Sequence, residues 1–248
     1  MDMNIKNIDN FGELFTEWKK SQLNDRLYDK LQQYCSNLKQ DAFACDGIVD
    51  DAMYSNCDFH VLYVMSESNA DEYVKRVENQ SEWDLNNEFR RFSDKGEDWP
   101  SRLKTKICEM QRIILKTETG IDVGIREAAK TIAVMNLNKR GGGKSISNKY
   151  LLEYFEPYVE KHQDFIKREV EIINPDLIIC CGNVPFDLMK KYGLTKVYKD
   201  KAIHMWHPSY TQIPKGRVES ENCISKSITI RRYIGKFEEK YRDFKMNQ

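Results

Sequence analysis

The chain lacks the features that mark membrane and secreted proteins. No apolar run in its 248 residues approaches the roughly 18 residues needed to cross a bilayer, and the first thirty residues are too polar for a secretory signal. The seven cysteines are scattered, and none forms a Cys-x-x-Cys pair. This spacing favours free thiols over zinc or iron–sulfur ligands. We therefore expect a cytoplasmic protein with no metal, no iron–sulfur cluster and no other cofactor.

The chain also lacks an excess of charge of either sign. Its 39 basic and 39 acidic residues cancel, so no overall field attracts the phosphates of nucleic acid, and any DNA binding needs a local basic patch. Internal repeats and low-complexity tracts are absent as well. An apolar content of 40% is enough to bury a sizeable core at this length. We expect a monomer with a single domain over residues 1–248.

Helical spacing is present in several segments. Apolar residues recur every three or four positions from Phe11 to about Lys39, which predicts amphipathic helices in an N-terminal helical extension, 1–42. The charged segment 70–130, with a break near 95–100, is typical of a helical insertion. Further helices are predicted over 148–173 and 221–244.

Short, almost continuously apolar runs predict four strands, at residues 60–65, 131–135, 177–181 and 202–206. Strands of this kind are buried on both faces, as in parallel sheets, and here they alternate with helices. The predicted fold class is therefore α/β: a three-layer αβα arrangement with a central four-stranded parallel sheet, plus N-terminal helices.

Polar residues follow each predicted strand. In open parallel sheets, ligands bind beyond the carboxyl ends of the strands. These positions hold Ser66-Glu67-Ser68-Asn69, then Asn136 with the glycine-rich basic loop 138–145, then Gly182-Asn183, and last His207-Pro208-Ser209-Tyr210. The sequence thus predicts a carboxylate, an amide and an imidazole at one edge of the sheet.

This ordered set of motifs resembles the uracil-DNA glycosylase superfamily. It consists of an apolar strand with an acidic turn, a strand ending in Asn before a Lys/Arg loop, a helix followed by NPDLIICCG, and a terminal WHPSY. The match spans roughly Phe43 to Tyr210. The opening DGIVD…VLYVMSESN is similar to an atypical bacterial branch of the superfamily that has no assigned substrate. The resemblance implies a uracil-DNA-glycosylase-like domain that acts on DNA.

The resemblance also implies roles for single residues. Glu67 stands at the acidic position that orients water and faces the sugar cation, and His207 stands where a histidine supports the departing base. Asn136 matches the amide that holds the flipped pyrimidine, with Asn69 and Ser66 also on the base-binding side. The residues it implies for contacts to DNA are Lys139, Arg140, Lys144, Ser209 and Tyr210. These residue types suit the reaction, because breaking a glycosidic bond builds positive charge on the sugar and negative charge on the base.

Two departures from the superfamily bear on the substrate. The first turn lacks the Gly and Pro of its relatives, and Asn69 stands where the strictest uracil enzymes place a Tyr that blocks a 5-methyl group. We therefore expect a monofunctional glycosylase that flips out uracil or a 5-substituted pyrimidine, including a glucosylated phage base, and leaves an abasic site. Action on phage DNA would make it an anti-phage defence enzyme.

Each motif also has a plain structural interpretation. Glu67 taken alone is a loop carboxylate, Asn136 an ordinary strand end, and His207 a core histidine; we treat His60, His162 and His204 as structural. One alternative function is a catalytically inactive nucleic-acid-binding protein with the same fold. Another is a nucleotide-phosphate enzyme that uses the glycine-rich loop, although the first glycine of a phosphate-binding loop is replaced by Asn138.

Overall fold

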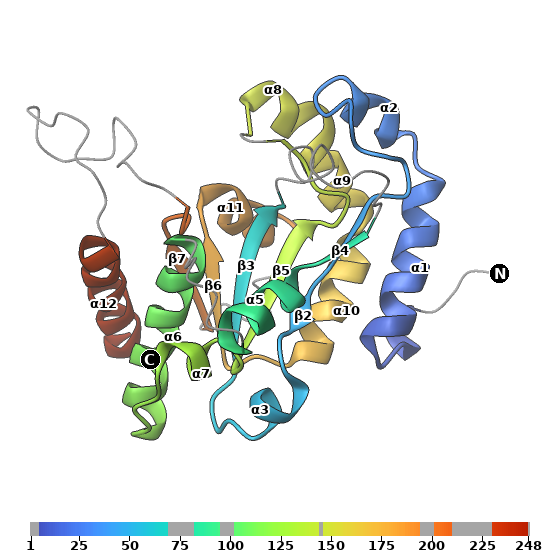
Figure 1. The fold of residues 1–248 in the computed structure, drawn as a ribbon. Coiled ribbons are helices and arrows are strands. Elements are labelled where there is room, and N and C mark those ends of the chain that lie inside the picture. Colours follow the sequence, from blue (N-terminus) through green and yellow to red (C-terminus); the bar gives the residue numbers. More distant parts are fainter. Residues whose placement is uncertain are drawn as a thin grey trace, which may run out of the picture.

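The computed structural model describes residues 5–68, 82–94, 102–143, 146–193, 201–209 and 230–247. These residues contain a five-stranded sheet with the strand order β2-β5-β3-β6-β7 (Figure 1). Its strands are β2 (Gly47–Ile48), β3 (Val61–Glu67), β5 (Ile132–Asn138), β6 (Leu177–Cys181) and β7 (Ala202–Met205). All neighbours are parallel except β2, which runs antiparallel to β5. The predicted α/β class with a mostly parallel sheet is confirmed.

The predicted number of four strands is wrong. The fifth strand is β2, whose two residues belong to none of the four predicted apolar runs. Gly47 has a turn-like backbone, with φ of 110°, a conformation that glycine adopts without strain. Nevertheless, residues 47–48 pair with Val134 and Ala133 and extend the sheet beyond β5.

Strands β3 and β5 run further than predicted. The ladder between them continues through Met65 opposite Asn136 to Glu67 opposite Asn138. Glu67 is therefore the last residue of a strand and not part of a turn, and Asn136 lies inside its strand and does not end it. The apolar pattern stops earlier than the ladder because the last positions hold polar side chains that bond to one another.

Two apolar clusters cover the two faces of the sheet. Leu62 and Val64 belong to one cluster and Val61 and Tyr63 to the other, because alternate side chains of a strand point to opposite faces. The first cluster includes side chains of α1 (Phe11–Leu23), α2 (Leu27–Gln32), α3 (Asp51–Ser55) and α11 (Asn183–Lys191). The second includes side chains of α5 (Leu85–Asp94), α6 (Arg102–Thr119), α7 (Ile125–Ala128) and α12 (Ile230–Met246). Helices therefore bury both faces of the sheet.

The predicted helix over 148–173 is divided. It comprises α8 (Asn148–Tyr150), a π-helical segment η2 (Leu151–Phe155), α9 (Glu156–Lys161) and α10 (Gln163–Ile173). Asn174, with φ of 47°, ends α10 in the left-handed conformation before a proline, at the predicted end of the helix. Single π-helical turns are rare and are often found at functional sites.

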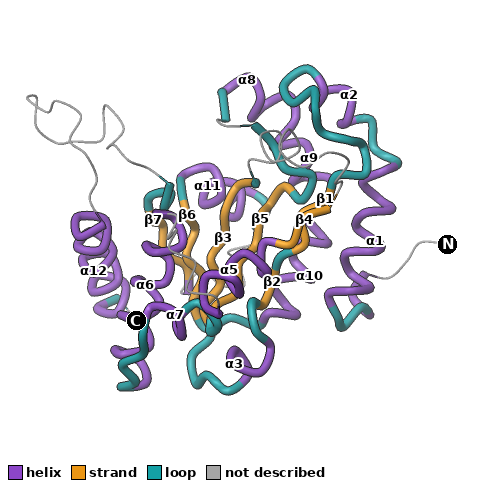
Figure 2. The backbone as a smooth tube through the Cα atoms, viewed as in Figure 1, coloured by secondary structure: helices purple, strands orange, loops and turns teal. Residues whose placement is uncertain are grey.

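The described residues of the N-terminal extension and of the insertion are mostly helical. Helix α1 is capped at its N-terminus by Asn10, whose side chain accepts from the N–H of Glu13 at 2.9 Å. The short 3₁₀ helix η1 (Ile5–Asn7) precedes α1. The insertion adds an unpredicted strand, β4 (Glu82–Asp84), which pairs with β1 (Phe43–Cys45) beside the main sheet (Figure 2). The predicted break at 95–100 lies outside the described residues. Within the described ranges, no helix has the length and apolar character that a bilayer span requires.

Candidate active site

The carboxyl ends of β3 and β5 are joined through the side chains of Glu67 and Asn138. The Nδ2 of Asn138 donates to Glu67 Oε2 at 2.7 Å, and the hydroxyl of Tyr150 donates to the same oxygen at 2.7 Å. We call Glu67, Asn138 and Tyr150 the acid cluster. It holds the carboxyl group of Glu67 by one oxygen, with donors from a neighbouring strand and from the start of the π-helical region.

The amide of Asn138 is fully used in holding this arrangement. Its Nδ2 also donates to the carbonyl of Gly141 at 2.8 Å. Its Oδ1 accepts from the N–H of Arg140 at 3.1 Å and from the hydroxyl of Tyr154 at 3.3 Å. Because both ends of the amide have partners, its orientation is fixed. Asn138 therefore positions Glu67 and has little capacity left to read a base.

One oxygen of the Glu67 carboxyl group is shielded from water. Its Oε1 is buried without a hydrogen-bond partner, and Gly142 lies against it: a Cβ added to Gly142 would be only 2.0 Å from Oε1. Burial raises the pKa of Glu67 to about 7, against the hydrogen bonds from Tyr150 and Asn138, which lower it. Glu67 therefore changes its charge near neutral pH, as expected of a carboxyl group tuned for acid or base chemistry.

Asn136 lies beside this cluster in a buried position. Its backbone N–H donates to Asp46 Oδ2 at 2.7 Å, and its Nδ2 donates to the hydroxyl of Ser68 at 3.2 Å. Ser66, at the end of the same strand β3, is also buried. The pairing of β3 with β5 thus places Glu67 and Asn136 near each other at the carboxyl ends of the two strands.

His207 follows β7 at the same edge of the sheet, separated from β3 by β6 in the strand order. The backbone N–H of Ser209 donates to His207 Nδ1 at 3.2 Å, and the Ser209 hydroxyl lies 2.6 Å from the same nitrogen. Nδ1 must have a lone pair to accept these bonds, so the neutral ring has its proton on Nε2. Burial and, to a smaller extent, the positive charge of Lys106 lower the pKa of His207 to about 4. The imidazole is therefore neutral at physiological pH.

The prediction that Lys139 and Arg140 contact DNA phosphates is wrong. Both side chains are completely buried. Lys139 pairs with Asp46 and, at 2.8 Å, with Glu169. These two basic residues belong to the core, because acidic side chains pair with them there. The acidic partners come from distant segments, so the sequence of the basic loop does not reveal them.

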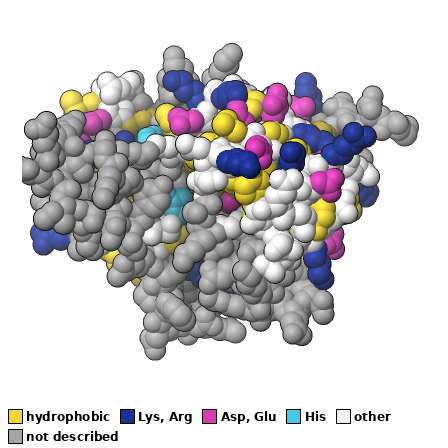
Figure 3. Space-filling view, turned by 90° about the horizontal axis from the view of Figure 1, so that it is seen from above, with side chains coloured by type: hydrophobic (Ala, Val, Ile, Leu, Met, Phe, Trp, Pro, Cys, Tyr) yellow, Lys and Arg dark blue, Asp and Glu magenta, His cyan; other side chains and the backbone are white. Residues whose placement is uncertain are grey.

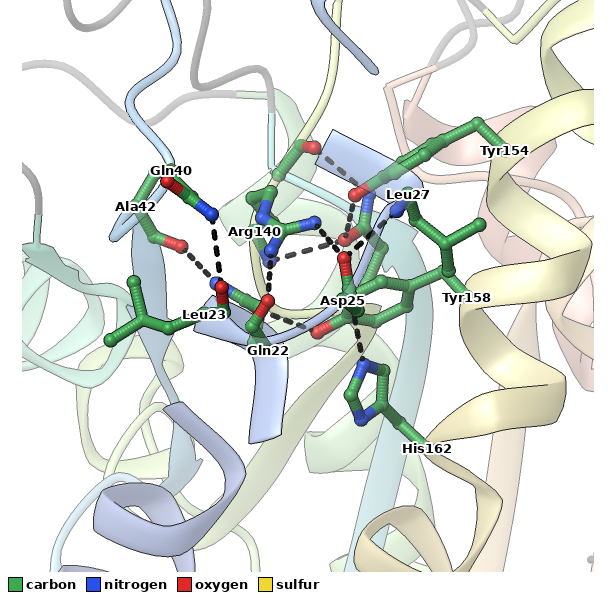
Figure 4. A network of polar contacts seen from close by, with 12 residues as sticks. Gln22, Leu23, Asp25, Leu27, Gln40, Ala42, Arg140, Tyr154, Tyr158 and His162 are labelled. Carbon is green, nitrogen blue, oxygen red and sulfur yellow. Dashed lines mark hydrogen bonds and ion pairs between the residues drawn. The ribbon is translucent and has the colours of Figure 1, made fainter. Parts of the chain in front are cut away.

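Arg140 belongs to a polar network that fixes the N-terminal extension (Figure 4). Its guanidinium donates to the carbonyl of Gln22 at 2.6 Å and to Asp25 at 3.3 Å. Asp25 also contacts His162 Nε2 at 3.2 Å, and Tyr158 donates to the side chain of Gln22 at 2.8 Å. The Arg140 network therefore connects the loop after β5 with the N-terminal extension and with the helical region that follows η2.

The surface above the carboxyl edge has mixed charge. Figure 3 looks down on this edge and shows lysine and arginine side chains interspersed with acidic ones, with histidine visible at the surface. The described side chains on this face do not gather into one basic patch. Three residues that the sequence suggested for base or DNA contacts, Asn69, Lys144 and Tyr210, lie outside the described residues. Ser209 is described and exposed, but its hydroxyl contacts His207.

Three neighbours of the predicted site residues were not predicted from the sequence: Asn138, Tyr150 and Lys106. Asn138 stands two positions after Asn136, so continuation of the strand ladder was the available signal. Tyr150 and Lys106 gave no local signal, because their partners are far away in the sequence.

The remaining histidines and cysteines have structural surroundings. His60 stacks on Tyr54, with ring centroids 4.5 Å apart, and His204 stacks on Phe186 at 4.8 Å. The cysteines in the described ranges are free thiols, and those ranges hold no group of three or more His, Cys, Asp or Glu residues that could bind a metal ion.

Comparison of the chain with protein-family models and with curated proteins finds no match to either.

Proposed function

We propose that this protein is a monofunctional DNA glycosylase that hydrolyses the N-glycosidic bond of uracil or a 5-substituted pyrimidine. The observation that supports this most is the acid cluster: a buried carboxyl group held by one oxygen, at the same sheet edge as a neutral histidine. The resemblance of the rim motifs to the uracil-DNA glycosylase superfamily supports the same reaction. The proposal includes the three-layer αβα arrangement of that superfamily, which the burial of both sheet faces by helices favours.

The two groups match the charges that develop during hydrolysis. As the bond from C1′ to the base breaks, the base leaves with the electron pair and the sugar becomes cationic. Ionised Glu67 stabilises that cation and orients the water that adds to C1′, and the proton of this water is released. The Nε2–H of His207 stabilises the negative charge on the departing base.

The role of Asn136 is to bind the flipped pyrimidine through its amide. An amide offers a donor and an acceptor to the edge of a base. Its contact with the hydroxyl of Ser68, at 3.2 Å, is weak enough to be exchanged for a base. Asn136 therefore differs from Asn138, whose amide has hydrogen-bond partners at both its nitrogen and its oxygen.

The proposal is tested by base excision. The protein is incubated with uracil-containing DNA and, separately, with phage DNA that contains modified cytosines, and abasic sites are detected by alkali cleavage. Glu67→Gln is expected to lower excision by about 10²- to 10⁴-fold while DNA binding persists. Glu171→Gln is the matched control, because it removes the same charge from an exposed side chain on α10, and it should leave excision unchanged.

A second function is favoured by one specific observation, the cover of Gly142 on Glu67 Oε1. A carboxyl group sealed in this way fits a nucleic-acid-binding protein without catalytic activity. DNA binding without excision of any of these substrates would overturn the glycosylase proposal and support this alternative.

A further inference from the structure

Lys106 is a completely buried lysine on helix α6. An ammonium group is costly to bury unless it is bonded. Its Nζ donates to the carbonyl of Pro208 at 2.8 Å and lies 4.6 Å from the centre of the Tyr233 ring, a cation–π distance. The charge of Lys106 is thus directed at the turn that contains His207.

Tyr233, on helix α12, binds the same turn at the residue before His207. Its hydroxyl donates to the carbonyl of Trp206 at 2.6 Å. The two carbonyls that flank His207 in the sequence are therefore each bound, by side chains from two different helices. Helices α6 and α12 pack together beside β7 (Figure 1), and the contact between Lys106 and Tyr233 joins the two donors.

The His207 side chain also packs against uncharged backbone at the end of β6. Gly182, at the end of β6, has φ of 119°, and a Cβ added to it would lie 3.7 Å from the Cβ of His207. Its N–H donates to the carbonyl of Met205 at 2.7 Å. Among the described residues, Lys106 is the charged group that acts on the His207 ring, and Tyr233 is the titratable neighbour of the turn.

We propose that Lys106 and Tyr233 are positioning residues for His207: they fix the backbone on both sides of the histidine and place a positive charge beside its ring. The charge opposes protonation of the imidazole, because an imidazolium next to an ammonium in a buried site is repelled. The fixed backbone keeps Ser209 bonded to Nδ1, so the ring proton stays on Nε2. That this proton serves the departing base rests on the proposed function, but the clamp itself does not.

The clamp is tested by NMR titration of the His207 ring in the full chain, with the resonance assigned from His207→Gln. Lys106→Met removes the charge and keeps much of the side-chain volume. We expect it to raise the pKa of His207 by about one unit or more, and to leave it below the ordinary value because burial persists. Lys116→Met is the matched control: it makes the same change at an exposed position of the same helix and should leave the titration unchanged. A Lys106→Met titration equal to that of the wild type would overturn the proposal.

Tyr233→Phe provides an independent test that does not alter the buried charge. It removes one hydroxyl, so the chain should still fold if Lys106→Met does not. Loss of the bond to Trp206 should speed hydrogen exchange of the Ser209 amide by roughly tenfold, while the pKa of His207 stays low. Unchanged exchange would overturn the clamp. These measurements do not depend on excision. If the protein excises no base but shows the expected changes in pKa and exchange, the clamp is supported and the glycosylase proposal is overturned. If it excises a base but shows neither change, only the clamp is overturned.

Discussion

Two polar segments follow strands at the same edge of the sheet, and they end in opposite surroundings. After β5, Lys139 and Arg140 are completely buried and paired with acidic side chains. After β7, His207 stays partly accessible and Ser209 is exposed. Within the described ranges, the N-terminal extension and α10 cover the first segment, whereas α6 and α12 contact the second through Lys106 and Tyr233 and leave Ser209 exposed. A position after a strand therefore does not by itself make a polar residue functional.

The largest expected effect lies in the buried segment. Lys139→Met leaves Asp46 and Glu169 in the core without their cation, although burial already raises the pKa of Glu169 well above its ordinary value. Removing one partner of a buried ion pair costs about 3–5 kcal/mol, so the free energy of unfolding should fall by this amount in denaturant titrations. Lys149→Met, at a side chain that is 71% exposed, should change it by less than about 0.5 kcal/mol.

This pair of variants tests whether the two segments really differ. If Lys139→Met left stability intact but weakened DNA binding and its dependence on salt, then Lys139 would face phosphates in the working protein. The two segments would then serve the same role.

A smaller effect is expected at the glycine-rich loop. Gly142→Ala puts a Cβ 2.0 Å from Glu67 Oε1, so the carboxyl group or the loop must move. Overpacking of this kind costs about 1–3 kcal/mol, and excision should fall because Glu67 leaves its bonds to Asn138 and Tyr150. Gly235→Ala is the control: nothing lies within 4 Å of its added Cβ, and within helix α12 alanine should raise stability by up to about 1 kcal/mol. Full excision by Gly142→Ala would show that the carboxyl group of Glu67 is not needed where it lies.

The sequence predicted the elements better than it predicted their surroundings. The apolar runs located β3, β5, β6 and β7, because continuous hydrophobicity is a local property of strands buried on both faces. It missed β2, whose two residues are held by pairing with β5 and not by their own pattern. For the same reason it placed Glu67 and His207 at the carboxyl edge but did not indicate their neighbours Asn138, Tyr150 and Lys106. Whether a polar side chain is a partner, a positioning group or a core ion depends on residues that lie far away in the chain.

The smallest expected effect concerns the pH dependence of excision. Glu67 must be ionised to stabilise a cation, and its pKa is raised to about 7, so excision should rise with pH through about 7 and then level off. The pKa of His207 is about 4, so this ring stays neutral across that range and adds no second limb. Tyr150→Phe removes a donor that favours the carboxylate. The pKa of Glu67 should then rise further, and the rising limb should move to higher pH by about one unit, with the plateau rate largely retained. Tyr34→Phe is the control, because Tyr34 packs against Tyr150 but donates to Glu153 and not to Glu67. If excision by Tyr150→Phe rose over the same pH range as in the wild type, the titration near neutral pH would belong to a group other than Glu67. The acid cluster would then have no part in the mechanism.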